Sequence, residues 1–134
     1  MIPREAYAVY LVTDDPSRYR EDFLDNVEAA VAGGVTLVQY RDTESSDRGK
    51  YARALRLLAM LRARGVPLVM NNDVDLAMAA GADEVAVFAA ASETFSRRNI
   101  NQGIAESLDN YASVCRTALD AGVPIHIVQD AAGH

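Results

Sequence analysis

The chain has 134 residues, of which 50% are hydrophobic and 24% are charged, and its formal net charge at pH 7 is -6. This length supports one globular domain with a buried core, and the acidic balance argues against nucleic-acid partners, which need clustered Lys and Arg. No apolar run approaches the ~20 residues of a membrane span, and the single cysteine suits a reducing compartment, so we expect no membrane partner and a cytoplasmic or recombinantly expressed protein.

The first half of the chain alternates apolar runs with helix-forming segments. Residues 7–12 form a continuous apolar run typical of a strand that is buried on both faces. Residues 19–32 carry apolar side chains at helical spacing and are followed by two glycines, which favour a helix stop. Residues 35–40 repeat the strand pattern. Ser46 then predicts a capped helix whose buried face holds Tyr51, Leu55, Leu58 and Leu61.

The second half repeats this alternation. Residues 66–70 predict a third strand, and Asp73 is expected to cap a short helix that ends at Gly81. Residues 84–88 and 124–128 predict two more strands, with a longer helical region between them. Strands that alternate with helices imply right-handed crossovers and a mostly parallel sheet. We therefore expect an α/β fold in a single domain, residues 1–134.

Five strands leave two arrangements open. Kept in the order 1-2-3-4-5, they would form part of a TIM barrel, which needs eight units, and the bare edges would favour a homodimer. Rearranged to 2-1-3-4-5, they would form an open doubly wound, flavodoxin-like sheet. In the second arrangement Asp14 and Asp15 would lie near Asp73, where carboxylates could hold Mg²⁺. Ordinary turn and cap roles explain the same three residues.

Residues 35–42, with the sequence VTLVQYRD, resemble the second strand of thiamine-phosphate synthases, and the resemblance covers about residues 7–83. It implies that Gln39 and Arg41 hold the pyrimidine and the diphosphate of a substrate, because Arg offers a planar fork to phosphate oxygens. Asn71 matches a further motif residue of the family. The family's lysine is replaced by Thr43. The resemblance thus implies a vestigial phosphate or sulfate site at Gln39, Arg41 and Asn71.

The same resemblance implies a Mg²⁺-dependent reaction whose carboxylates are missing here. At the positions of the family's two metal-binding aspartates this chain has Asn72 and Ala91. At the positions of the family's His and Gln it has Ala86 and Ala89. Because departure of a diphosphate needs metal or cationic stabilisation, we expect no catalytic residues and no cofactor.

A second resemblance covers about residues 81–133. Residues 91–101, with the sequence ASETFSRRNIN, are similar to the central region of 3-hydroxy-3-methylglutaryl-CoA lyases, which are also TIM-barrel enzymes. The paired metal-binding histidines of that family are absent, since the chain holds only His126 and His134. His126 lies in an apolar strand and is expected to be a packed, hydrogen-bonded core residue.

The two resemblances together predict a chimera. Its synthase-like segment would be residues 1–82 and its lyase-like segment residues 83–134, joined in register at the Ala-Gly-Ala-Asp turn. The hypothesis that follows is an engineered or recombined scaffold that folds and has no intact natural activity. The alternative is a degenerate thiamine-phosphate-synthase-like protein, or a phosphate or anion binder at the carboxyl ends of the strands.

Overall fold

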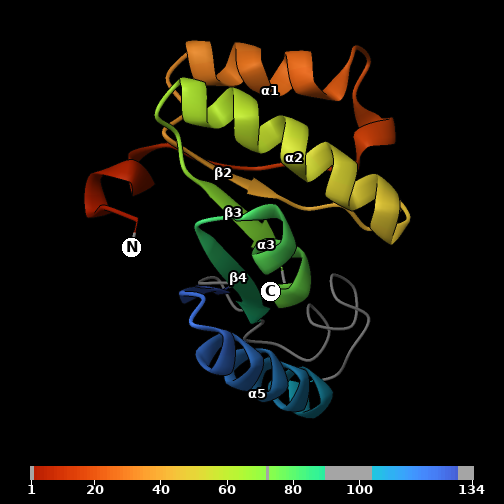
Figure 1. Ribbon diagram of the computed structural model, residues 1–134, viewed down its shortest axis with the longest axis vertical. Coiled ribbons are helices and arrows are strands. Elements are labelled where there is room, and N and C mark those ends of the chain that lie inside the picture. The colour runs from red at the N-terminus through yellow and green to blue at the C-terminus, as the bar shows by residue number, and fades with distance from the viewer. Residues whose placement is uncertain (1, 72, 90–103, 130–134) are drawn as a thin grey trace.

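The computed structural model describes residues 2–71, 73–89 and 104–129 (Figure 1). Within these ranges the chain forms one parallel sheet flanked by helices. The strands are β1 (Tyr10–Val12), β2 (Leu37–Tyr40), β3 (Leu68–Asn71), β4 (Glu84–Ala89) and β5 (Ile125–Gln129). The helices are η1 (Arg4–Ala8), η2 (Pro16–Arg18), α1 (Phe23–Ala32), α2 (Asp47–Ala63), α3 (Val74–Ala80) and α5 (Ile104–Ala121).

The strands follow one another across the sheet in the order β1-β2-β3-β4-β5. Each neighbouring pair is parallel and hydrogen-bonded, from Tyr10 opposite Leu37 at one side to Ala89 opposite Gln129 at the other. The α/β fold is confirmed in its barrel-like order, and the flavodoxin-like alternative is wrong. The reason is that β2 lies between β1 and β3, the two strands that the alternative would pair. Self-association through the outer strands stays a prediction.

Side chains at the helix ends supply the expected caps. Ser46 Oγ accepts a hydrogen bond from the backbone nitrogen of Gly49 at 3.1 Å, and Asp73 Oδ1 accepts one from that of Leu76 at 2.9 Å. Gly81 ends α3 with a φ of 81°, a left-handed conformation that favours glycine. The start of α1 differs from the expected residue 19, because Asp22 caps the helix after the short η2 turn.

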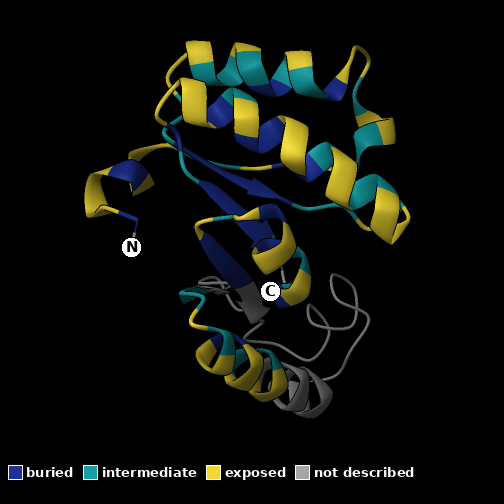
Figure 2. Cartoon of the chain, in the orientation of Figure 1, coloured by how far each residue is buried: buried dark blue, intermediate teal, exposed yellow. Residues whose placement is uncertain are grey.

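The helices α1, α2, α3 and α5 pack against one face of the sheet (Figure 1). Val38, Leu68 and Val85 point to this face from three strands and are fully buried. The expected buried stripe of α2 is wrong in part, because Tyr51 and Leu55 are exposed, and Figure 2 shows exposed positions along the outer side of α2. The helix residues that complete this core are Phe23, Val27, Ala54, Leu57, Leu58, Leu61, Val74, Ala77, Ala80 and Ala118.

The opposite face of the sheet carries a smaller core. Leu37, Val69 and Ala86 lie on it, and Ile2 and Ala6 cover them from the N-terminal side. Residues 7 and 8, expected in the first strand, belong instead to the 3-10 turn η1. This turn brings the N-terminal segment back over the sheet. No helix in the described part of the chain is long and apolar enough to cross a membrane.

Candidate functional site

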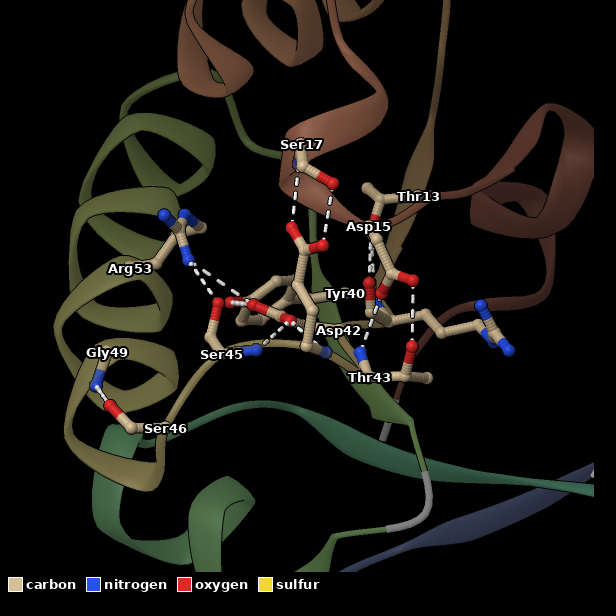
Figure 3. Close-up of polar contacts among 12 residues, drawn as sticks. Thr13, Asp15, Ser17, Tyr40, Asp42, Thr43, Ser45, Ser46, Gly49 and Arg53 are labelled. Atoms are coloured by element: carbon tan, nitrogen blue, oxygen red, sulfur yellow. Dashed lines mark hydrogen bonds and ion pairs between the residues drawn. The ribbon is translucent and has the colours of Figure 1, made fainter.

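Polar side chains gather where β1 and β2 end. Thr13, directly after β1, accepts a hydrogen bond at Oγ1 from the backbone nitrogen of Arg41 at 3.0 Å and donates one to the carbonyl of Arg41 at 3.3 Å. Thr43 donates to Asp15 twice, from its nitrogen to Oδ1 at 2.6 Å and from Oγ1 to Oδ2 at 2.7 Å (Figure 3). The segment after β1 and the loop after β2 are therefore joined at the backbone of Arg41 and again at Thr43.

Asp42 is the centre of the β2–α2 loop. Its Oδ2 accepts hydrogen bonds from Tyr40 Oη at 2.6 Å and from Arg53 Nη1 at 3.3 Å (Figure 3). Its Oδ1 accepts from the backbone nitrogens of Glu44 and Ser45. Burial raises the pKa of Asp42, but these donors outweigh it and lower the pKa to about 2. Asp42 therefore acts as the structural anchor of the loop, with its oxygens occupied.

Arg41 is placed differently from its neighbours in the loop. The carboxylate of Glu44 is engaged by Ser17, whose nitrogen and Oγ donate at 2.7 and 2.6 Å. The guanidinium of Arg41, by contrast, forms no hydrogen bond or ion pair with the described residues. The backbone hydrogen bond from Thr43 lowers the pKa of Asp15, and the positive charge of Arg41 contributes to the same shift. Arg41 is thus a half-buried cation whose side chain has no hydrogen-bond or ion-pair partner in the described part of the chain.

A second group of polar side chains lies on the sheet face that carries the smaller core. Gln39 is only 2% exposed, and its amide bridges two strands. Its Nε2 donates to Tyr10 Oη at 2.8 Å, while its Oε1 accepts from Asn71 Nδ2 at 2.8 Å. Asn71 is the last residue of β3 and is half-buried, so it lies nearer the carboxyl edge than Gln39. The structure thus brings Gln39 and Asn71 into contact.

The chain of hydrogen bonds continues through residues that the sequence did not single out as a site. Tyr10 Oη lies 2.8 Å from His126 Nε2, and His126 Nδ1 lies 3.0 Å from Glu84 Oε2. Tyr7 Oη donates to the same carboxylate oxygen at 2.7 Å. The expectation of a packed, hydrogen-bonded His126 is confirmed. The available signal was the presence of single polar residues within apolar strands, since buried polar groups need partners.

The three residues considered for Mg²⁺ do not gather in the described structure. Asp14 pairs with Arg18 at 3.6 Å, both oxygens of Asp15 are bonded to Thr43, and Asp73 caps α3. Asp14 and Asp15 follow β1 and Asp73 follows β3, so β2 separates them. No group of three His, Cys, Asp or Glu side chains suited to a metal occurs among the described residues.

Other positions named from the two resemblances lie outside the described residues. These are Asn72, Ala91, residues 91–101 and His134.

Comparisons with known proteins agree with the first resemblance. The profile of the family described as thiamine monophosphate synthase matches residues 9–104. The thiamine-phosphate synthase of Azorhizobium caulinodans is 47% identical over 78 residues, which are 58% of this chain and 37% of that protein. That of Thiobacillus denitrificans is 46% identical over 83 residues, 62% of this chain and 37% of that protein. The chain thus spans little more than a third of the length of these relatives.

Two solved structures resemble the whole fold. The thiamine phosphate pyrophosphorylase of Pyrococcus furiosus has a TM-score of 0.58 at 21% identity, over 91% of this chain and 60% of that chain. The HMG-CoA lyase of Brucella melitensis has a TM-score of 0.61 at 27% identity, over 90% of this chain and 48% of that chain. The likeness to the lyase therefore extends to both sides of the expected junction and is a likeness of fold.

The hypothesis of an engineered or recombined scaffold without natural activity is wrong. The synthase profile continues to residue 104, through the turn at Gly81 where two segments were expected to meet. Natural synthases are 46–47% identical to the chain over 78 to 83 residues. A TIM-barrel-like fold is common to this chain and to both solved structures. Because the profile covers more than half of the residues, the chain belongs to the thiamine monophosphate synthase family.

Proposed function

We propose that the chain has a thiamine-phosphate-synthase-like function, in which the carboxyl edge of β2 and β3 binds a pyrimidine diphosphate. The observation that carries this proposal is the guanidinium of Arg41, which has no partner among the described residues although the carboxylates around it are engaged. A guanidinium fixed at its backbone and open at its tip is suited to bidentate recognition of phosphate oxygens.

Asn71 is the residue suited to the pyrimidine. Its Nδ2 is held by Gln39, and its Oδ1 forms no hydrogen bond with a described residue. A planar amide held in this way offers a directed hydrogen-bond acceptor to a ring substituent. Gln39 is buried and bonded at both ends of its amide, so it acts on a ligand through Asn71. In this arrangement Arg41 binds the diphosphate of the ligand and Asn71 binds its pyrimidine ring.

The described residues do not fit a resident Mg²⁺ ion at this edge. The carboxylates that the chain offers there are committed to Thr43, to Arg18 and to the N-terminus of α3. A hard cation prefers several oxygen ligands that converge on one point, and these do not converge. We therefore assign the binding of the diphosphate to Arg41 without a metal-dependent step.

Titration calorimetry of the full chain with a pyrimidine diphosphate and with inorganic diphosphate tests the proposal. Replacing Arg41 with Gln should weaken both ligands about tenfold or more, because a charge-assisted pair is lost. Asn71→Ala should weaken the pyrimidine diphosphate alone. Arg56→Gln, which changes an exposed arginine of α2, is the matched control and should leave both affinities unchanged.

The outcomes distinguish a thiamine-phosphate-synthase-like function from a simple phosphate or anion binder, the two alternatives to the scaffold hypothesis. Equal affinity of wild-type chain for the pyrimidine diphosphate and inorganic diphosphate would indicate a simple phosphate binder. Absence of heat with either ligand, or equal loss in the Arg41 and Arg56 variants, would contradict the proposal.

A further inference from the structure

Five side chains form one continuous line of hydrogen bonds across the sheet. The line runs from Glu84 on β4 through His126 on β5, Tyr10 on β1 and Gln39 on β2 to Asn71 on β3, and its four contacts measure 3.0, 2.8, 2.8 and 2.8 Å. Its first member, Glu84, is buried, and its last member, Asn71, is at the carboxyl edge. A histidine is therefore connected to the proposed ligand contact by polar groups alone.

The directions of these hydrogen bonds depend on one another. Asn71 Nδ2 donates to Gln39 Oε1, and Gln39 Nε2 donates to Tyr10 Oη. The hydroxyl hydrogen of Tyr10 is then free to be donated to His126 Nε2, which accepts only when the ring is neutral and carries its hydrogen on Nδ1, facing Glu84. Each of the four contacts then joins one donor to one acceptor, and Asn71 Oδ1 is directed away from Gln39.

A proton added to His126 reverses this order. Both ring nitrogens become donors, so Nε2 donates to Tyr10, and Tyr10 must find a new acceptor for its own hydrogen. Rotation of the Gln39 amide by half a turn supplies it, since Oε1 then faces Tyr10 and Nε2 faces Asn71. The Asn71 amide must rotate as well, to offer Oδ1 to Gln39. Each of the four contacts again joins one donor to one acceptor, and Asn71 now directs Nδ2 outward.

We propose that the protonation state of His126 determines whether Asn71 presents a hydrogen-bond acceptor or a donor to the ligand. Neutral His126 selects a pyrimidine whose substituent donates, such as an amino group, and protonated His126 selects one whose substituent accepts, such as a carbonyl oxygen. His126 and Tyr10 are positioning residues in this scheme, because they act through Gln39 and Asn71. The ligand preference rests on the proposed function, whereas the coupling within the chain does not.

The surroundings of His126 allow such a relay. The titratable groups that face it among the described residues are Tyr7 from η1, Tyr10 from β1 and Glu84 from β4. β5 itself contributes no other ionisable side chain. Burial, together with the charge of Glu84, raises the pKa of Tyr10 to about 12, so its hydroxyl keeps the hydrogen that the relay passes on. Burial likewise raises the pKa of Tyr7.

Nuclear magnetic resonance on the ¹⁵N-labelled full chain tests the coupling without any ligand. The ring nitrogens of His126 and the side-chain amide of Asn71 are followed as the pH is lowered from alkaline values until the ring signals of His126 stop changing. The chain has two histidines, and His134→Gln assigns their signals. The Asn71 amide should shift with the midpoint of His126 in wild type and lose that shift in Tyr10→Phe. A second variant, Gln39→Met, breaks the line at another point if Tyr10→Phe fails to fold.

The coupling is overturned if Asn71 shows no shift at the His126 midpoint, or if the shift persists when the line is broken.

A second experiment compares the affinities of amino- and oxo-substituted pyrimidine diphosphates. Because both ligands carry the same diphosphate, its contribution cancels in the ratio of the two affinities. Neutral His126 should favour the amino ligand about tenfold, and this preference should vanish or reverse at low pH. His126→Gln should make the ratio independent of pH. A pH-independent ratio in wild type overturns the specificity role, whereas absence of binding by either ligand beside an intact coupling contradicts the proposed function alone.

Discussion

Asp15 and Thr43 are joined by two hydrogen bonds, from Thr43 nitrogen to Oδ1 at 2.6 Å and from Thr43 Oγ1 to Oδ2 at 2.7 Å. The resemblance to thiamine-phosphate synthases implies a lysine at the position of Thr43. In its place the chain has a hydroxyl that holds a carboxylate, so the edge has one cation fewer. The net charge that a bound diphosphate experiences at this edge therefore depends on the positive charge of Arg41 and the negative charge of Asp15.

Asp15→Asn should strengthen the binding of inorganic diphosphate. One negative charge near Arg41 is removed, and an amide oxygen can still accept a hydrogen bond from Thr43, so we expect a gain of about threefold at low salt. The gain should shrink at high salt because the charges are partly exposed. Calorimetry checks both effects. Asp75→Asn, on the exposed side of α3, is the control, and an equal gain there would show that only net charge matters.

The Asp42 anchor should make the stability of the chain fall in acid. The pKa of Asp42 is lowered from 3.8 to about 2, and its side chain is 2% exposed. A lowered folded-state pKa contributes stability that is complete above pH 3.8 and is lost as the pH falls towards 2. The contribution is about 2 kcal/mol.

Urea unfolding at several pH values measures this contribution. Asp42→Asn should be less stable than wild type at neutral pH, by about 1–3 kcal/mol, and the difference should narrow between pH 4 and 2. A constant difference across that range would contradict the assigned role.

Gln39→Met should destabilise the fold while keeping the volume of the side chain. The two hydrogen bonds to Tyr10 and Asn71 are lost, and their partners remain in a buried site, so we expect a cost of about 1–3 kcal/mol. Gln39→Glu should cost more, because a carboxylate would be buried without a cation among the described residues. Thermal unfolding ranks the variants. Equal stability of Gln39→Met and wild type would show that the buried amide network contributes little.

Gly81→Ala should lower stability by about 1 kcal/mol, since the φ of 81° is strained for any residue with a Cβ atom. Space is not the cause, because a Cβ there would lie 3.8 Å from its nearest neighbour. Gly33→Ala is the matched control at the end of α1, where φ is -82°. Similar losses in the two variants would contradict the backbone explanation.

The sequence predicted the repeating architecture well, because its signals are local. The five apolar runs, the caps at Ser46 and Asp73 and the stop at Gly81 all depend on residues close in the chain. The order of the strands could not be predicted, since it depends on which strands pair after the crossovers form. The buried face of α2 was misplaced at Tyr51 and Leu55, where the apolar pattern is wider than the face that packs.

The candidate site was predicted only where a family motif marks it. Gln39, Arg41 and Asn71 follow from the resemblance, but the buried role of Gln39 depends on Tyr10, a contact between different strands. The link from His126 to Glu84 joins residues 42 positions apart, so the sequence shows each polar residue within its apolar strand but not that the two pair. The hypothesis of a scaffold without natural activity was wrong. It was inferred from two resemblances that meet at the turn around Gly81, whereas the family match continues through this turn to residue 104.

Mapping a bound pyrimidine diphosphate on the ¹⁵N-labelled chain tests the central claim most directly. We predict that the largest ligand-induced shifts fall on the backbone and guanidinium of Arg41 and on the side-chain amide of Asn71. Arg41→Gln should abolish those shifts at the same ligand concentration, while Arg56→Gln should keep them. Shifts located instead along η1 or α2, or shifts that survive in Arg41→Gln, would contradict the claim.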